Sequence, residues 1–423
     1  MSTRSEPVTL VNSARTRVAM GPTTRAINAL SSACRVLRFP KCLQNQEPSA
    51  IESLPDELIM LIAEKLKLDA PSLANFAAAS ASCLAAAHGE LRAALLAAVQ
   101  RCLTHCVTFG VEVACPYFRL PEDLVDLPAK AFMCCGFLTR ITLPAALATI
   151  GTNAFSNCRS LTKVDLSGAA ALTRIDEAAF MLCESLTHVT LPAALTSIGN
   201  NTFKYCASLA LTSLPSGLTS IGDSAFEGCT SLSLTSLPGG LTSISICAFH
   251  GCASLALSSL PHSLTSIGGR AFLNCTALAL TSLPDRLTSI GDRAFSHCKS
   301  LALTSLPDGI TSIGWGAFLN CTSLALTSSL PDGLTSIGPS TFENCAALAL
   351  TSLPDGLASI GDRAFSHCTS LASTSLPDRL TTRIGNEAFH GSLGKKSPAT
   401  QAVHKLLRRL RRQLKRLGLR PSY

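Results

Sequence analysis

The stretch Leu-Thr-Ser-Ile-Gly-Asp-Arg-Ala-Phe-Ser-His-Cys, residues 287–298, recurs with small changes through the second two-thirds of this 423-residue chain. Its phenylalanine returns twelve times, mostly 23 residues apart, at Phe132, Phe155, Phe180, Phe203, Phe226, Phe249, Phe272, Phe295, Phe318, Phe342, Phe365 and Phe389. A unit that short cannot bury its own apolar face, so neighbouring units must stack, and the sequence predicts a solenoid. Such a stack presents long regular surfaces, which favours binding of other macromolecules over catalysis.

Each unit has a set of positions expected to face inward. In one unit these are Leu195, Ile198, Phe203 and Cys206, while prolines such as Pro192 mark corners where no backbone donor is needed. The glycine after the isoleucine is expected to supply the tight turn that follows a short strand. It stands at Gly199, Gly222, Gly268, Gly291, Gly314, Gly338, Gly361 and Gly385.

Cysteine use follows the repeat. Eleven of the 19 cysteines lie three residues after the phenylalanine, at Cys135, Cys158, Cys183, Cys206, Cys229, Cys252, Cys275, Cys298, Cys321, Cys345 and Cys368. That position should point to the same interior corner of every coil, where a small apolar thiol packs well. We therefore expect a buried column of free thiols. Free thiols persist in reducing compartments, so the column favours a cytoplasmic or nuclear protein.

Two features of the strands are left open. Early units place Ile141, Val164 and Val189 six residues after the cysteine, whereas most later units place leucine five residues after it. A one-residue slip turns a side chain outward unless the strand bulges. Threonine followed by serine would form hydroxyl rows that either suit an exposed strand or make a contact surface. These threonines are Thr196, Thr219, Thr242, Thr265, Thr288, Thr311 and Thr335.

The units resemble leucine-rich repeats of the BspA-like class, in which Leu-x-x-Ile-Gly-x-x-Ala-Phe-x-x-Cys alternates with Leu-x-x-Val-x-Leu-Pro. The resemblance covers about residues 121–389 and implies a curved, parallel solenoid of about twelve 23-residue coils over residues 116–392. Helical segments are expected on both sides of it. The expected fold class is therefore α+β, a leucine-rich-repeat solenoid preceded by a small three-helix domain and followed by a basic helix.

Residues 48–115 are expected to form that three-helix domain, since apolar residues recur there at helical spacing. Its opening Leu-Pro-Asp-Glu-Leu-Ile, residues 54–59, resembles an F-box, although alanines at residues 85–87 replace the tryptophan or arginine often found near the end of that motif. The resemblance implies binding to the adaptor subunit of an SCF-type ubiquitin ligase through Leu54, Pro55, Leu58, Ile59, Ile62 and Leu66. The alternative is that these helices only cap the open end of the solenoid.

Both ends of the chain are basic. Residues 1–42 hold seven lysines and arginines against one acid, so residues 1–47 are expected to be a disordered basic leader or an organelle transit peptide. Residues 395–423 hold ten and no acid, so the rest of the chain sums to −2 within the net +8. Leu407, Leu410 and Leu414 predict a basic amphipathic helix over residues 393–423. It would cap the last repeat, bind an acidic surface or meet nuclear import machinery.

No group of residues in the sequence matches a catalytic or ligand-binding motif well. Residues 394–397, Gly-Lys-Lys-Ser, resemble the end of a phosphate-binding loop, but Phe389 stands where the first glycine is required. Cys102, His105, Cys106 and Cys115 lack the usual zinc-ligand spacings and are interpreted as core residues.

His297 and His367 lie in duplicated units and fit the repeat surface better than a catalytic role. We therefore expect no enzyme, no cofactor, no metal ion and, since apolar stretches stay short of about 18 residues, no transmembrane segment. The favoured function is a non-enzymatic receptor that recruits an unknown protein partner, held by the repeats, to an SCF-type ubiquitin ligase. The alternative is a BspA-like scaffold or adhesion protein.

Overall fold

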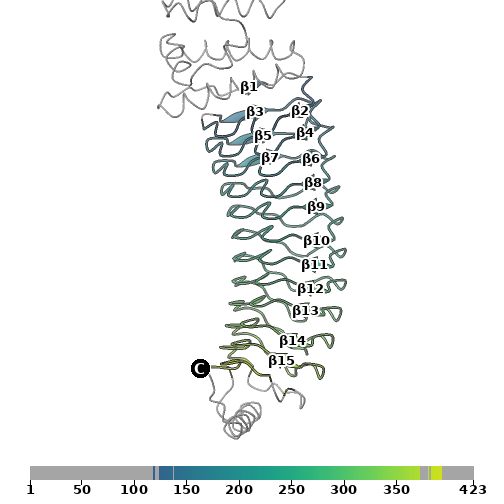
Figure 1. The fold of residues 1–423 in the computed structure, drawn as a ribbon, viewed down its shortest axis with the longest axis vertical. Coiled ribbons are helices and arrows are strands. Elements are labelled where there is room, and N and C mark those ends of the chain that lie inside the picture. The colour runs from purple at the N-terminus through teal and green to yellow at the C-terminus, as the bar shows by residue number, and fades with distance from the viewer. Residues whose placement is uncertain (1–117, 120–122, 137, 372–379, 381–382, 393–423) are drawn as a thin grey trace, which may run out of the picture.

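The computed structural model describes residues 118–119, 123–136, 138–371, 380 and 383–392. They form one column of stacked coils, so the predicted solenoid is confirmed (Figure 1). No α-helix occurs among the described residues. The leader, the three-helix domain with its adaptor-binding residues 54–66, and the basic helix at residues 393–423 lie outside them.

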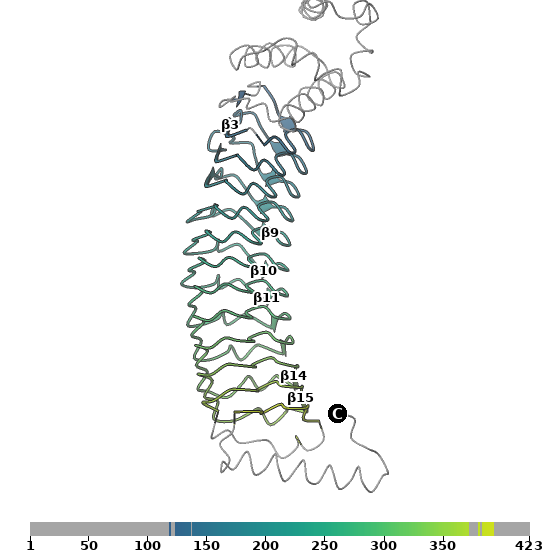
Figure 2. The same ribbon diagram turned by 90° about the vertical axis from the view of Figure 1, so that its left-hand side faces the viewer.

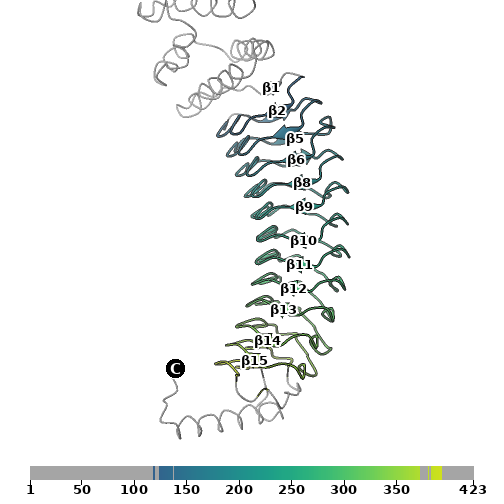
Figure 3. The ribbon, with the colours of Figure 1, turned by 45° about the vertical axis from the view of Figure 1, so that its right-hand side comes forward.

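Short parallel strands run down two sides of the column. One side carries β1 (Phe118–Arg119), β3 (Arg140–Thr142), β5 (Lys163–Asp165) and β7 (His188–Thr190). The other begins with β2 (Asp126–Leu127), β4 (Thr149–Ile150), β6 (Arg174–Ile175), β8 (Ser197–Ile198) and β9 (Ser220–Ile221). It continues through β10 (Ser243–Ile244), β11 (Ser266–Ile267), β12 (Ser289–Ile290), β13 (Ser312–Ile313), β14 (Ser336–Ile337) and β15 (Ser359–Ile360). Figure 2 and Figure 3 show that the successive coils keep one orientation along a gently bent column.

The strand register equals one repeat, so equivalent residues lie side by side. Ser243 pairs with Ser266 and Ile244 with Ile267, and the same pairing continues in the next coil. Every isoleucine of these strands is buried while the preceding residue lies outside the core. The period-2 alternation of a strand thus sorts one apolar and one polar residue in each coil.

A continuous apolar core fills the column. Each phenylalanine ring stacks on those of the adjacent coils, with centroids 5.1 to 5.6 Å apart and planes within 14° of parallel. All twelve rings take part, from Phe132 to Phe389. Leu195, Ile198, Phe203 and Cys206 are buried as expected. Parallel rings at this separation are offset stacks, which add stabilisation to the area that each ring buries.

The thiol column is also confirmed. Each cysteine of the column from Cys158 to Cys368 donates its S–H to the carbonyl oxygen of the phenylalanine one coil earlier, for example Cys298 Sγ to Phe272 O at 3.0 Å. All thirteen cysteines among the described residues are free. In the last coil Ser392 takes the cysteine position and donates its hydroxyl to Phe365 O.

The glycines after the isoleucines act differently from our expectation. Their φ is not positive, so no left-handed turn needs them. They are needed because the coils approach closely: a Cβ on Gly291 would lie 2.5 Å from the Gly269 nitrogen, and one on Gly199 2.8 Å from the Asp176 carbonyl carbon. Positive φ occurs instead at two other positions of each coil, two residues before and two residues after the phenylalanine. Most residues there are not glycine.

The slip between early and late units has a structural basis. Ile141, Val164 and Val189 lie in the strands of the first side, which ends at β7. In later coils the segment loses its regular pairing, and single bonds such as Ala302 N–H to Leu280 O at 3.1 Å join neighbours. Leu234 and its equivalents in the following coils still point inward and are buried, and Leu211 is partly buried against the same core. The slip therefore ends a strand and does not expose the side chain.

Candidate functional site

The most extended surface with one composition is the face formed by β8 to β15, here called the hydroxyl face. Its exposed positions are threonine followed by serine in coil after coil, and Ala358 is the one replacement of threonine from β8 to β15. Since neighbouring strands lie about 4.8 Å apart, eight coils extend roughly 35 Å. No charged side chain interrupts the two positions in that stretch.

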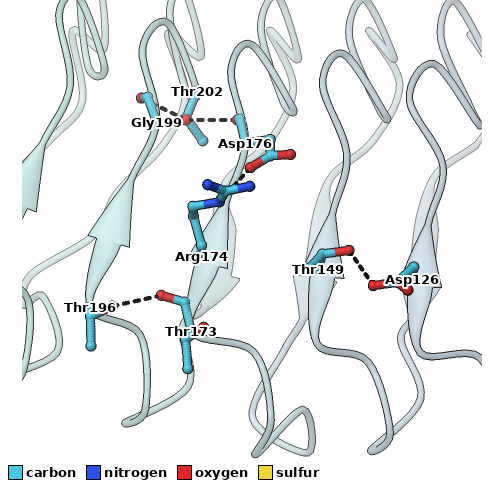
Figure 4. Close-up of polar contacts among 8 residues, drawn as sticks. All are labelled: Asp126, Thr149, Thr173, Arg174, Asp176, Thr196, Gly199 and Thr202. Atoms are coloured by element: carbon cyan, nitrogen blue, oxygen red, sulfur yellow. Dashed lines mark hydrogen bonds and ion pairs between the residues drawn. The ribbon is translucent and has the colours of Figure 1, made fainter.

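The threonine hydroxyls of this face are used within the coils. Thr196 Oγ1 donates to Thr173 O at 3.1 Å (Figure 4). The same bond is repeated at 3.0 to 3.4 Å by Thr219, Thr265, Thr288 and Thr311. The backbone N–H of the same threonine donates to the same carbonyl. These five hydroxyls therefore donate their hydrogen within the stack and offer only lone pairs outward. In these coils the hydroxyl face presents threonine acceptors beside the serine hydroxyls.

The first coils make the same face charged. Arg174 Nε lies 2.8 Å from Asp176 Oδ1, and Thr149 Oγ1 donates to Asp126 Oδ1 at 2.6 Å (Figure 4). Exposed pairs of this kind contribute little to stability. They mark the coils before β8 as chemically different from the uniform region.

Acidic residues after the glycines have a structural task. The Asp292 carboxylate accepts the Trp315 N–H at 3.0 Å, and Asp223 and Asp362 do the same for the next coil. Each carboxylate accepts a backbone N–H that is not paired in the strand ladder between coils. These aspartates therefore link adjacent coils and are not catalytic candidates.

One group of side chains departs from the repeat pattern. It lies on the turns that carry the stacked phenylalanines, here called the phenylalanine turns. Glu227 Oε2 lies 2.9 Å from Lys204 Nζ, while its Oε1 accepts the Tyr205 hydroxyl at 3.2 Å and lies 3.6 Å from His250 Nδ1. Cys247 completes the group, and the ligand atoms of Glu227, Cys247 and His250 all lie within 4.8 Å of one another. No other group of three potential metal ligands occurs in the described part of the chain.

The charges of this group are held by its neighbours. Burial opposes ionisation of Glu227, but hydrogen bonds from Lys204 and Ser224 prevail and hold the pKa of the carboxyl below its usual value. Burial opposes the charge on Lys204 too, but the bond to Glu227 raises the pKa of its ammonium. Burial, and then the Glu227 charge, raise the pKa of the Cys247 thiol.

The thiols of the buried column, here called the ladder cysteines, have raised pKa values from Cys158 to Cys368. Burial raises the pKa of Cys368 to about 12 and raises that of Cys298 further. A thiol reacts as the thiolate, so these cysteines are inert near neutral pH. They are structural.

The histidines singled out by the sequence lie on the repeat surface. His297 Nε2 is 3.3 Å from the Asn320 amide nitrogen, and the ring of His367 meets that of His390 edge-on at 5.4 Å. The phosphate-loop-like residues 394–397 and the Cys102 to Cys115 group lie outside the described residues. The Glu227 group has no local sequence motif, because Glu227 lies 20 residues before Cys247 and 23 before His250. Its signal in the sequence is that adjacent units differ at equivalent positions.

The comparisons with known proteins concern the repeats. The model of the BspA type leucine rich repeat region (6 copies) matches residues 113–233, 196–325 and 288–401. These matches do not reach residues 54–66. No curated protein matches the chain.

Several solved structures are similar in fold. A leucine-rich repeat protein from Bacteroides ovatus ATCC 8483 is 27% identical, covers 65% of this chain and 84% of its own, and gives a TM-score of 0.48. A leucine rich cell surface protein from Faecalibacterium prausnitzii A2-165 is 26% identical, with 62% and 87% covered and a TM-score of 0.42. In the described part of this chain no helix has the length and hydrophobicity to cross a membrane.

Proposed function

The chain belongs to the BspA-type leucine-rich-repeat family, since the family model covers residues 113–401, and from this premise we propose that it is a non-catalytic protein-binding scaffold. The observation that carries the proposal is the hydroxyl face from β8 to β15, where every coil presents serine and every coil but the last presents threonine, although strand pairing is interrupted between β9 and β10 and between β13 and β14. A rigid stack of nearly identical coils holds that face in one shape, so little order is lost when a partner binds.

The chemistry of the face defines the partner. Threonine hydroxyls that already donate to carbonyls present lone pairs, so the partner should offer donors such as amide N–H groups or basic side chains. The small side chains allow close approach of an extended protein segment. The 23-residue period favours a partner with its own repeating contacts, because every coil presents the same pair of residues.

The test compares proteins captured by the full chain and by a face variant. Ser220, Ser243 and Ser312 are exposed on the hydroxyl face, and their side chains make no hydrogen bond within the described part of the chain, so replacing them by glutamate should leave the fold intact. We expect the triple variant to lose a partner that the parent chain binds at micromolar or lower concentration, measured by affinity capture and then by calorimetry with the purified partner.

The control places the same charges elsewhere. Ser216, Ser231 and Ser323 are exposed residues off the strands, and their triple glutamate variant should keep the partner. If both variants bind every captured protein equally, the hydroxyl face is not the binding surface.

We also propose, as a separate matter, that residues 54–66 recruit the adaptor of an SCF-type ubiquitin ligase. This rests on the Leu-Pro-Asp-Glu-Leu motif alone. In the full chain, Leu58→Asp with Ile62→Asp should abolish capture of the purified adaptor and leave partner binding by the repeats unchanged. Normal adaptor binding by the double variant, or none by the parent chain, would leave the scaffold without this role.

The proposed location is cytoplasmic or nuclear, and one support for it is weaker than the sequence suggested. Thiols that are fully buried resist oxidation in any compartment, so the ladder cysteines do not require a reducing one. The proposed location therefore rests on the F-box-like motif at residues 54–59. Imaging of the tagged full chain tests it.

A further inference from the structure

We propose that Glu227, Cys247 and His250 form a binding site for a divalent transition metal ion, with Zn²⁺ as the best fit. Their ligand atoms lie within 4.8 Å of one another. Carboxylate oxygen, thiolate sulfur and imidazole nitrogen are the three ligand types that zinc takes in proteins. This site is independent of the hydroxyl face, since its residues lie on the phenylalanine turns.

The backbone already holds two of the ligands in a chelating arrangement. Cys247 and His250 are the ends of one Cys-x-x-His turn, which is closed by the His250 N–H bond to Cys247 O at 3.1 Å. Phe249 anchors the turn from inside, because its ring lies in the stack 5.5 Å from both neighbours. The third ligand comes from the preceding coil, where Glu227 follows Phe226 just as His250 follows Phe249.

The distances suit a metal with little rearrangement. Ligand atoms around a tetrahedral zinc ion are roughly 3.5 Å apart, so atoms that lie within 4.8 Å of one another need to approach by at most about 1.3 Å. Glu227 Oε1 faces His250 Nδ1 at 3.6 Å, while Oε2 stays with Lys204 at 2.9 Å. The Tyr205 hydroxyl now donates to Oε1 and would give way to the ion. A fourth position is left for water or a ligand.

Several departures from the repeat pattern lie together here. The position after the phenylalanine is lysine, glutamate and histidine in three successive coils, at Lys204, Glu227 and His250, whereas leucine, methionine or serine fills it in the other coils except at Glu343 and His390. Cys247 is the one cysteine at its repeat position, two residues before the phenylalanine. When repeats are nearly identical, residues that differ from the pattern on adjacent coils indicate a specific function at that place.

The test measures binding of Zn²⁺ and Co²⁺ alone to the metal-free full chain. We expect one equivalent more than in the double variant Cys247→Asn, His250→Leu, with affinity lowered about a hundredfold or more in the variant. Co²⁺ should give a thiolate-to-metal absorption band that the variant lacks. Both replacements are residues that other coils carry at the same positions, Asn153 and Leu273, so the fold should persist by circular dichroism.

The matched control is Cys134→Asn with His367→Asn, which removes another partly exposed cysteine and another histidine. It should bind as the parent chain does, so any metal held by cysteines elsewhere is counted equally in both. Equal stoichiometry and affinity in the parent chain and the Cys247→Asn, His250→Leu variant would overturn the proposal. The group would then be an ion-pair network only.

Discussion

At the scale of single residues, the solenoid tolerates strained backbone where glycine would be easier. Every coil has two residues at positive φ, and only Gly228, Gly251, Gly316 and Gly391 among them are glycines. Left-handed backbone costs an ordinary residue about 1–2 kcal/mol. The inter-coil bonds of these residues, such as His297 N–H to Leu319 O at 2.7 Å, hold that conformation.

Two adjacent coils provide a reciprocal test of this strain. Ser340 and Gly316 hold the same repeat position, with φ of 52° and 58°. We expect Ser340→Gly to raise the free energy of unfolding by about 0.5–1 kcal/mol and Gly316→Ser to lower it by a similar amount, because only glycine is unstrained there. Urea unfolding measures both. Changes of equal sign would contradict the strain argument.

The cysteines provide a second residue-scale prediction. At pH 8 a thiol reagent should modify Cys134 and Cys247, which are partly exposed, and leave the ladder cysteines of the described coils unmodified until the chain unfolds. Because burial raises the pKa of Cys368 to about 12, raising the pH from 7 to 9 should not make it reactive in the folded state. Mass spectrometry of labelled peptides measures this, with denaturant as the control.

At the scale of elements, the strands lie close because glycine removes the side chain that would separate the coils. A Cβ at Gly291 would meet backbone atoms of the preceding coil at 2.5 to 2.9 Å. Backbone cannot move aside as a flexible side chain can. At Gly291 the glycine therefore serves the close approach of the coils and not a left-handed turn.

We expect Gly291→Ala to destabilise the solenoid by about 1–3 kcal/mol, as overpacking does. The matched control is Gly239→Ala, where an added Cβ has no neighbour within 4 Å and φ is not positive. That variant should change the free energy of unfolding by less than about 0.5 kcal/mol. Chemical denaturation measures both, and equal effects would refute the role of close approach.

At the scale of the whole molecule, each coil contacts only its neighbours, as the strand pairs and ring stacks show. Stability is then close to a sum of equal increments. The number of coils sets the length of the hydroxyl face without changing its structure.

Deletion of residues 288–310 tests this property. It removes 23 residues and joins Leu287 to Thr311, which restores the Leu-Thr-Ser-Ile pattern. We expect a folded chain with an unchanged circular dichroism shape and an m-value reduced by roughly a twelfth. Deletion of residues 288–299 breaks the phase and should disrupt the adjacent coils. Similar spectra from the two deletions would contradict this interpretation.

The sequence by itself determined the period, the inward leucine, isoleucine, phenylalanine and cysteine, and the solenoid. These could be predicted because every coil repeats one environment, so one unit explains the others. The helical segments at residues 48–115 and 393–423, with the F-box-like residues, remain predictions.

Only the tertiary structure decided which atoms meet across coils. It showed that the threonine hydroxyls donate to carbonyls, that Gly291 serves close approach, and that Glu227, Cys247 and His250 converge. Such contacts depend on differences of a few ångströms between neighbouring coils. A linear pattern specifies which positions are equivalent, but the separation of two side chains depends on the packing that stacks them.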